Sequence, residues 1–332
     1  MYLNAGIIGL GVGEEHLKCL KKNRQIKTIK IFDKNPRKTT FFAKKYKVYG
    51  CKNINEIFDD NQIKVVCIAS NDDDHSNHIQ KCLKNDKHTF VEKPAFLKVS
   101  DAKKTFNTLK NKKHIFFYTN HILRKSERFK KLQSLINQKT LGKIYYFEGD
   151  YNYGRLNKII NGWRTNIKNY SVTLGGGIHL IDLSNFLLNE KITEVKSYSN
   201  RIVTKNTNFK SQDCIVTIMK FKNNIIGKIT SNFGCVYPHF HKLNIYGTKK
   251  TFENHIDFAK IFTHRDKNTF YKLNEKYKPL NKGLLLDEFL KSILSNKNRN
   301  KYIKEVFDCL SVCFAIDTSI KNNKTIKIKY FK

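Results

Sequence analysis

Residues 3–16 read LNAGIIGLGVGEEH, an apolar run followed by three glycines and the start of a helical pattern. The run at 3–9 is typical of a buried strand. Glycines between a strand and a helix let the backbone approach a pyrophosphate, whose charge the helix N-terminus stabilises. The third glycine comes one position earlier than in the usual G-x-G-x-x-G spacing, where this chain has Glu14. We predict a dinucleotide-binding turn formed by Gly9, Gly11, Val12 and Gly13.

The next apolar run, residues 26–33, ends in an acid, Asp33. A carboxylate at the end of the second strand accepts hydrogen bonds from the ribose hydroxyls of the adenosine. It also repels a 2′-phosphate, so Asp33 favours NAD as the cofactor. Lys34, Arg37 and Lys38 follow closely and leave NADP possible.

The rest of the first third continues to alternate strands and helices. Further strands are expected at 65–70, 89–92 and 114–119, separated by helical patterns. Such alternation predicts a doubly wound parallel sheet of the α/β class, a Rossmann domain over residues 1–119.

From residue 120 onward the pattern changes to consecutive strands, which predicts an α+β domain over 120–332. Its open sheet is expected to be largely antiparallel and covered by helices. The expected strands are 144–154, 195–203, 214–221, 225–233, 242–247 and 325–330. The expected helices are 123–137, 177–188, 284–294 and 303–320.

The composition of the chain argues against a nucleic-acid-binding, membrane-spanning or metal-binding protein. The chain has 332 residues, 63 basic and 28 acidic, giving a formal net charge of +35. Only nine of the basic residues are arginine, the residue that reads bases bidentately, so we expect no nucleic-acid partner. No apolar run approaches the roughly 18–20 residues of a membrane span. Eight cysteines without a C-x-x-C pair predict reduced thiols in a cytoplasmic protein and no metal site.

Residues 90–94, FVEKP, place a lysine at the end of a predicted strand. Open α/β sheets bind ligands at this edge. Desolvation there would lower the pKa of Lys93 and allow it to exchange a proton with a substrate hydroxyl. A cis bond before Pro94 could fix its direction. From the tripeptide alone, a surface lysine before a turn is an equally open interpretation.

Residues 174–182, LGGGIHLID, run three glycines into a helix. The glycines would permit a ligand to approach the helix N-terminus closely. His179 and Asp182 are three residues apart and share a helix face. A lone histidine on an apolar helix is more often a core residue, so a catalytic role for His179 depends on Lys93 and Asp182 joining it.

These motifs together resemble the Gfo/Idh/MocA family of oxidoreductases over essentially the whole chain. The resemblance implies NAD(P)-linked hydride transfer at a sugar or cyclitol carbon by a homodimer or homotetramer. It implies that the domain over 120–332 binds substrate and forms oligomers. It implies Lys93 near the reacting hydroxyl and the cofactor, His179 as acid or base, and Asp182 orienting the substrate. It also places Asn120 at the domain junction, beside the substrate. The cofactor contacts that it implies are Ser70, Asn71, His75 and Glu92.

One position departs from the family pattern. Family members commonly carry an aspartate one helical turn before the histidine, and this chain has Gly175 there. A Lys-Asp-His triad is therefore not carried over, and Lys93 and His179 must suffice.

Aromatic and guanidinium groups gather just before the histidine helix, in residues 151–155 (YNYGR) and 162–164 (GWR). We predict that Tyr153, Arg155, Trp163 and Arg164 bind substrate. A sheet face with a packing tryptophan is an equally open interpretation of these residues. Aromatic rings stack on sugars, and arginine forms two parallel hydrogen bonds to a phosphate. These residues therefore favour a nucleotide-linked sugar of surface-polysaccharide synthesis as the substrate. The alternatives are a dehydrogenase of a free sugar or inositol and a cofactor-binding regulatory protein without turnover.

Residues 237–241, YPHFH, are a second candidate loop, whose two imidazoles could reach the active-site cleft. A simple hairpin connection is favoured, and no role is assigned to them.

Overall fold

The computed structural model describes residues 2–278 and 281–332, which form two compact units. The first unit comprises Met1–His121, Leu280–Phe307 and Phe331. The second comprises Ile122–Pro279, Asp308–Tyr330 and Lys332. Helix α10 (Arg299–Asn322) contributes residues to both.

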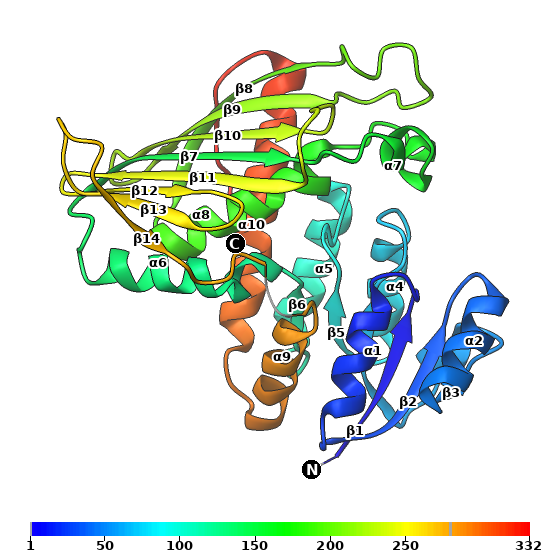
Figure 1. The fold of residues 1–332 in the computed structure, drawn as a ribbon. Helices are drawn as coiled ribbons and strands as arrows, with labels where there is room; N and C mark the ends of the chain where they lie inside the picture. The colour runs from blue at the N-terminus through cyan, green and yellow to red at the C-terminus, as the bar shows by residue number, and fades with distance from the viewer. Residues whose placement is uncertain (1, 279–280) are drawn as a thin grey trace. The chain divides into compact units, whose positions relative to one another are not determined.

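The first unit is built on a six-stranded parallel sheet in the order β3-β2-β1-β4-β5-β6 (Figure 1). This order is that of the doubly wound dinucleotide-binding fold, so the predicted Rossmann domain is confirmed. Strands β1 and β4 are almost wholly buried, as parallel strands covered on both faces must be. The strands are β1 (Leu3–Ile8), β2 (Ile26–Phe32), β3 (Tyr49–Gly50), β4 (Ile63–Ile68), β5 (His88–Val91) and β6 (Phe117–Thr119).

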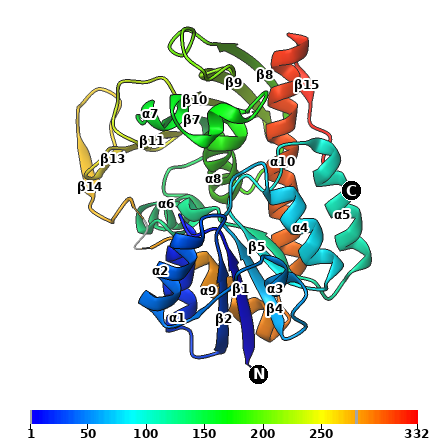
Figure 2. The same cartoon turned by 90° about the vertical axis from the view of Figure 1, so that its right-hand side faces the viewer.

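Helices cover both faces of this sheet (Figure 2). Helices α1 and α9 pack together on one face, and α4 and α5 pack together on the other. The helices are α1 (Gly13–Lys22), α2 (Pro36–Tyr46), α3 (Asn55–Phe58), α4 (His75–Lys84), α5 (Val99–Asn111) and α9 (Leu284–Ser295). Helix α2 begins directly after Asn35, because the Asn35 side chain caps the helix by accepting from Arg37 N.

Helix α9 belongs to the first unit although it follows residue 280 in the chain. The ring of Phe289 contacts those of Phe90 (5.5 Å between centroids) and Phe116 (6.5 Å). Arg299 donates to the carbonyls of Leu109, Lys112 and Ile115. We predicted a single boundary between residues 119 and 120. The contacts instead return the chain to the first unit, because α9 supplies apolar side chains that cover this sheet.

The second unit contains a nine-stranded sheet in the order β14-β13-β12-β11-β7-β10-β9-β8-β15. All neighbours are antiparallel except β7 and β10, which confirms a largely antiparallel sheet. Three short strands, β12 to β14, were not expected from the sequence. The strands are β7 (Ile144–Asn152), β8 (Ile192–Asn200), β9 (Cys214–Phe221), β10 (Ile226–Asn232), β11 (Phe240–Gly247), β12 (Thr251–Asn254), β13 (Ala259–Phe262), β14 (Phe270–Leu273) and β15 (Ile326–Lys327).

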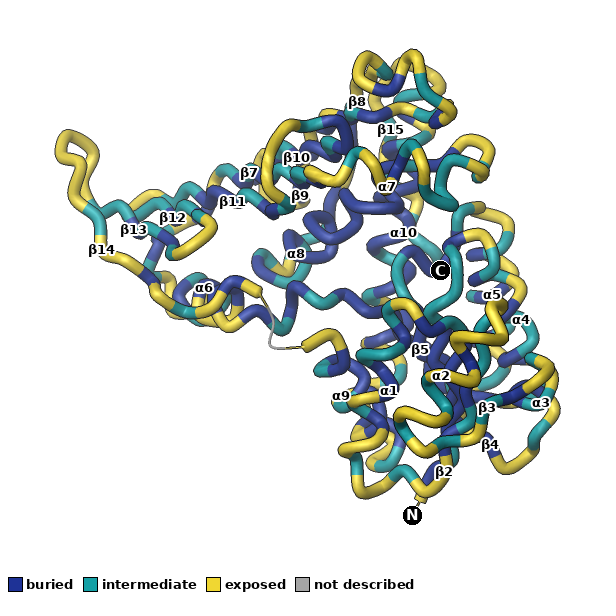
Figure 3. Tube along the Cα trace, turned by 45° about the vertical axis from the view of Figure 1, so that its right-hand side comes forward, coloured by how far each residue is buried: buried dark blue, intermediate teal, exposed yellow. Residues whose placement is uncertain are grey.

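Helices α6 (Glu127–Asn137) and α8 (Ile178–Leu188) pack together, and α8 lies against β7 of the sheet. Figure 3 shows α8 buried almost throughout. The predicted helix 123–137 is broken, because Ser126 caps α6 and a 3₁₀ turn, Ile122–Lys125, precedes it. Helix α7 (Asn157–Ile160) is one turn long. Among the described residues, no helix has the length and apolarity needed to cross a bilayer.

Candidate active site

The glycine turn of the first unit has the shape that a dinucleotide requires. Gly9 follows β1 with φ +91°, and a side chain there would overlap the carbonyl of Ala69. An added Cβ at Gly11 would meet no atom within 4 Å, so the backbone is open at this point. Val12 precedes α1, and no side chain caps that helix. The first N–H groups of α1 can therefore donate to a pyrophosphate, and this geometry fits NAD.

Asp33 lies directly after β2 and is held by the same turn. Its Oδ2 accepts from the backbone N of Leu10 at 2.7 Å, and its Oδ1 accepts from Asn35 N at 2.9 Å. The carboxylate is thus fixed beside the glycine turn, where ribose hydroxyls would lie. Lys34 pairs with Asp74 at 2.7 Å, so its charge is partly neutralised. Both features favour NAD over NADP.

The loop after β4 carries three of the predicted cofactor residues, Ser70, Asn71 and His75. His75 is fully buried, and its ring bridges two carbonyls, with Nδ1 at 2.7 Å from Pro94 O and Nε2 at 3.0 Å from Ser70 O. His75 therefore ties this loop to the segment after β5. Ser70 Oγ hydrogen-bonds to His78, and Asn71 O accepts from Asp74 N.

Glu92 follows β5 and is the centre of a small polar cluster. Its Oε1 lies 2.9 Å from His16 Nε2 and accepts from Asn120 Nδ2 at 2.8 Å. Burial alone would raise the pKa of Glu92, but the hydrogen bond and charge of His16 and the Asn120 amide outweigh it and lower the pKa to about 2. The Asn120 amide also donates to Lys282 O. The hydrogen bonds of Glu92 thus connect the ends of β5 and β6 to each other and to α1.

Lys93 comes next in the chain and is partly exposed. Its peptide bond to Pro94 is cis, as the sequence suggested. Lys93 therefore directly follows Glu92, whose carboxylate is held by His16 of α1 and by Asn120 after β6.

The three glycines before α8 have a different role from the one predicted. They form a π-helical turn, Thr173–Gly177, that continues directly into α8, and all of them are buried. A Cβ at Gly175 would overlap the Tyr170 hydroxyl, and one at Gly176 would overlap the Tyr151 ring. The groups that approach this backbone are therefore the protein's own side chains, and the same packing leaves no room for an aspartate at position 175.

His179 lies in the first turn of α8, 8% exposed, among aromatic rings. It stacks on Tyr151 of β7 (5.9 Å between centroids, 22°) and meets the ring of His241 of β11 edge-on (5.4 Å, 86°). His239 lies 5.3 Å from His241. The stretch predicted to be a plain connection thus contributes His241, which contacts His179, and His239, which contacts His241. Their spacing of two residues, which is typical of one face of a strand, was a partial signal, because only His241 lies in β11 and His239 comes just before it.

Asp182 is buried in an ion pair that the sequence did not predict. Arg124 donates from Nε to Oδ2 at 2.8 Å and from Nη2 to Oδ1 at 2.7 Å. Only 1% of Asp182 is exposed. A bidentate pair of this kind occupies both carboxylate oxygens, so Asp182 holds α8 to the turn before α6.

Four of the residues predicted to bind substrate form two contacting pairs, Tyr153 with Arg155 and Trp163 with Arg164. Tyr153 stacks on Phe233 (4.6 Å, 13°), and Arg155 lies over the Tyr153 ring. Arg164 lies over Trp163 (4.1 Å) and donates from Nε to the Tyr170 hydroxyl at 2.9 Å. Both guanidinium groups are thus engaged with aromatic side chains.

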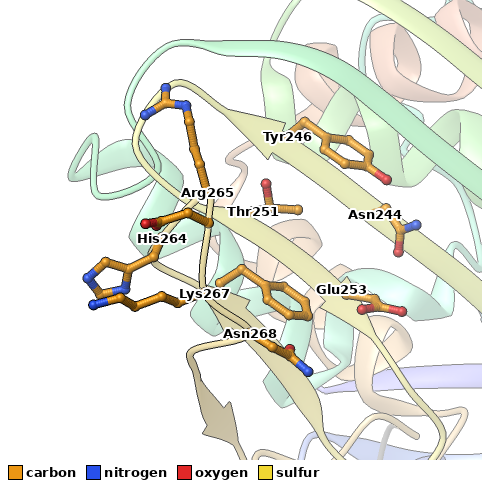
Figure 4. Close-up of a pocket in the computed structure, with 10 residues that line it drawn as sticks. Asn244, Tyr246, Thr251, Glu253, His264, Arg265, Lys267 and Asn268 are labelled. Atoms are coloured by element: carbon orange, nitrogen blue, oxygen red, sulfur yellow. The ribbon is translucent and has the colours of Figure 1, made fainter.

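A cavity of about 450 Å³ lies on the other face of the second unit's sheet (Figure 4). The residues lining it include Asn244, Tyr246 and Glu253, from β11 and β12, and Arg265 and Lys267 from the loop after β13. Asn244 and Tyr246 alternate with His241 along β11 and face away from it. None of the predicted site residues lines this cavity. We therefore place the candidate site at His179 and the rings of Tyr151 and His241 that contact it, and not at this cavity.

A glycine turn, an uncapped helix N-terminus and a fixed acid after β2 in a 3-2-1-4-5-6 sheet define a protein of the dinucleotide-binding class. Residues 3–121 match the oxidoreductase family with an NAD-binding Rossmann fold, and residues 129–253 match the GFO/IDH/MocA C-terminal domain. The chain belongs to the GFO/IDH/MocA family, and its cofactor is NAD.

Relatives are found both among curated proteins and among solved structures. The chain is 25% identical over 254 residues to myo-inositol 2-dehydrogenase of Thermotoga maritima, covering 74% of this chain and 73% of that protein. Levoglucosan dehydrogenase in complex with NADH has a TM-score of 0.86, 17% identity and full coverage of both chains. Scyllo-inositol dehydrogenase of Lactobacillus casei, with NAD(H) and scyllo-inositol bound, has a TM-score of 0.80 at 16% identity, covering 98% and 99%.

Proposed function

We propose that the protein is an NAD-dependent dehydrogenase of a free sugar or an inositol-like polyol. The observation that carries this proposal is the setting of His179, a mostly buried imidazole that stacks on Tyr151 and meets the ring of His241 edge-on. His241 in turn contacts His239. Neutral imidazoles and phenols suit an uncharged polyhydroxylated ring, because they offer hydrogen bonds without requiring a charge on the ligand.

The nucleotide-linked sugar favoured by the sequence has less support. That prediction relied on arginines that fork onto phosphate, yet Arg155 lies over Tyr153 and Arg164 is bonded to Tyr170. The named relatives act on inositols and levoglucosan, which carry no phosphate, and this agrees with the polyol proposal.

In the proposed reaction a secondary alcohol loses a hydride from carbon and a proton from oxygen. NAD supplies the hydride acceptor when bound. His179 or Lys93 takes the hydroxyl proton as general base and releases it to solvent. Imidazole performs this task near neutral pH, and the partly exposed amine of Lys93 performs it once bound substrate excludes water from it. The cluster around Glu92 keeps the segment that carries Lys93 in place.

Absorbance at 340 nm tests the proposal with purified protein, NAD and a panel of inositols, free sugars and nucleotide sugars. Turnover is expected with a cyclic polyol or free sugar and not with nucleotide sugars. His179→Asn and Lys93→Met should each lower kcat by about 10²–10⁴-fold without weakening NADH binding. Arg164→Ala should leave KM unchanged for a polyol. NADH binding with no turnover on any compound would instead favour a regulatory protein.

A further inference from the structure

A phenol–imidazole pair, Tyr277 and His241, lies next to His179 in the second unit, where the His241 ring contacts that of His179. Tyr277 is 6% exposed, and its hydroxyl contacts His241 at two atoms. It accepts from the backbone N of His241 at 2.9 Å, and it hydrogen-bonds to Nδ1 of the same residue. One hydroxyl therefore fixes both the backbone and the ring of His241.

The hydrogen bonds indicate where His241 carries its proton. Burial raises the pKa of Tyr277 above its ordinary value, so the phenol keeps its proton at neutral pH. The backbone N–H of His241 already donates to the phenol oxygen, and a buried hydroxyl needs an acceptor for its own hydrogen. Nδ1 of His241 lies within its reach. If Nδ1 accepts, the neutral ring carries its hydrogen on Nε2.

Tyr277 is itself held by packing on several sides. Its ring meets those of Phe129 (5.9 Å, 83°) and Phe240 (5.1 Å, 64°) edge-on. The guanidinium of Arg128 lies over its ring at 5.9 Å. Arg128 is buried and donates to the carbonyls of Glu275 and Asp257. The hydroxyl therefore has a fixed position from which to orient His241.

His241 in turn bounds His179. The two rings meet at 86°, and Tyr151 stacks on His179 at 22°, so the plane of His179 is defined by neighbours in two directions. His241 also faces His239 and Tyr151. The charges of Arg155 and Arg164 act on Tyr151, and those of Arg128 and Arg155 on Tyr277. These guanidinium groups already make the surroundings of His241 positive. A neutral His241 ring adds no further positive charge next to His179.

We propose that Tyr277 holds His241 as the neutral Nε2–H tautomer, and that His241 is a positioning residue that orients His179 for proton transfer. This rests on the proposed function for the role of His179, whereas the tautomer of His241 can be tested without any substrate. The pair acts through His179, so its loss should lower kcat and leave NADH binding intact.

The test compares Tyr277→Phe with Tyr330→Phe in the full-length protein. Tyr330 is a matched control, because its partly buried hydroxyl donates to a backbone carbonyl of the same unit, Ile192 O, at 2.8 Å. With ¹⁵N-labelled histidine, wild type and Tyr330→Phe should show His241 as a single Nε2–H tautomer at pH 7. Tyr277→Phe should show a mixture of tautomers. A wild-type His241 that is charged or protonated on Nδ1, or one unchanged in Tyr277→Phe, overturns the proposal.

The kinetic readout separates positioning from general stability. Tyr277→Phe should lower kcat about ten- to a hundredfold, with KM and the Kd for NADH nearly unchanged, since misorientation of a catalytic group costs rate and not cofactor affinity. His241→Asn serves as a second variant, because its Oδ1 can still accept from Tyr277 while the ring beside His179 is lost, and it should show the same drop. If the tautomer shifts but kcat does not, the positioning role is refuted. Inactivity of wild type on every polyol refutes the proposed function and leaves the tautomer result to stand separately.

Discussion

The buried Arg124–Asp182 pair should be among the costliest single contacts to break in the second unit. Both partners are at most 10% exposed, and two hydrogen bonds of 2.7 and 2.8 Å join them. Removing one partner of a buried pair leaves the other charge uncompensated, which typically costs about 3–5 kcal/mol. We expect Arg124→Met and Asp182→Asn each to lower the free energy of unfolding by about this amount.

Guanidinium denaturation measures the effect, with fluorescence of Trp163, the single tryptophan, reporting the second unit. The double variant removes both charges and should lose about 2–3 kcal/mol less than the sum of the single changes, because neighbours that share an interaction are not additive. Lys18→Met breaks an exposed pair with Glu15 and serves as the control, followed by circular dichroism. It should cost less than about 1 kcal/mol.

Two results would refute this reasoning. Asp182→Asn could retain the wild-type stability within about 1 kcal/mol, which would mean that removing the carboxylate charge leaves no costly unpaired guanidinium. Alternatively, the single changes could add fully in the double variant, which would mean that the two side chains do not act on each other in the folded protein.

Three further predictions concern single positions. Gly175→Ala should destabilise the second unit by about 1–3 kcal/mol in the same denaturation assay, because its Cβ overlaps the Tyr170 hydroxyl. Gly11→Ala is the control, because its Cβ has open space and the change should cost no stability. Equal stability of the two variants would contradict this prediction. Burial lowers the pKa of His78 to about 4 from 6.5, so the unfolded chain binds this proton more readily and stability should fall by about 3 kcal/mol between pH 6.5 and 4. His78→Gln should flatten that slope, and an unchanged slope would show that other groups cause it. Asp33→Ser should strengthen NADP binding relative to NAD in calorimetry, while Asp59→Ser, an equal change of charge on an exposed loop, should leave the ratio unchanged.

The parts of the fold that the sequence predicted well are those specified by local patterns. The strand–glycine–helix order around Gly9 and the acid at the end of β2 are short-range signals, and the structure has both. The glycines before α8 were also read locally, as a place for a ligand. There the local pattern misled, because the rings of Tyr151 and Tyr170 that fill the space come from other parts of the chain.

Contacts between distant residues could not be predicted from a single chain. Asp182 gives no sign that its partner is Arg124, 58 residues earlier. Strands β12 to β14 were missed because each is only four residues long and carries few β-branched residues. His241 was given no role because its contacts are to Tyr277, 36 residues later, and to His179 of helix α8, neither of which the local sequence reveals.

The late return of the chain to the first unit affects how the protein is made. Residues 1–121 leave the ribosome long before α9, and residues 122–279 must be synthesised in between. At 5–20 residues per second this takes roughly ten to thirty seconds. During that time Phe90 and Phe116 lack the Phe289 ring that covers them in the finished protein. A nascent Rossmann sheet with an uncovered apolar face is a ligand for chaperones, so depletion of ribosome-associated chaperones should reduce the yield of this protein more than that of a Rossmann domain encoded without interruption.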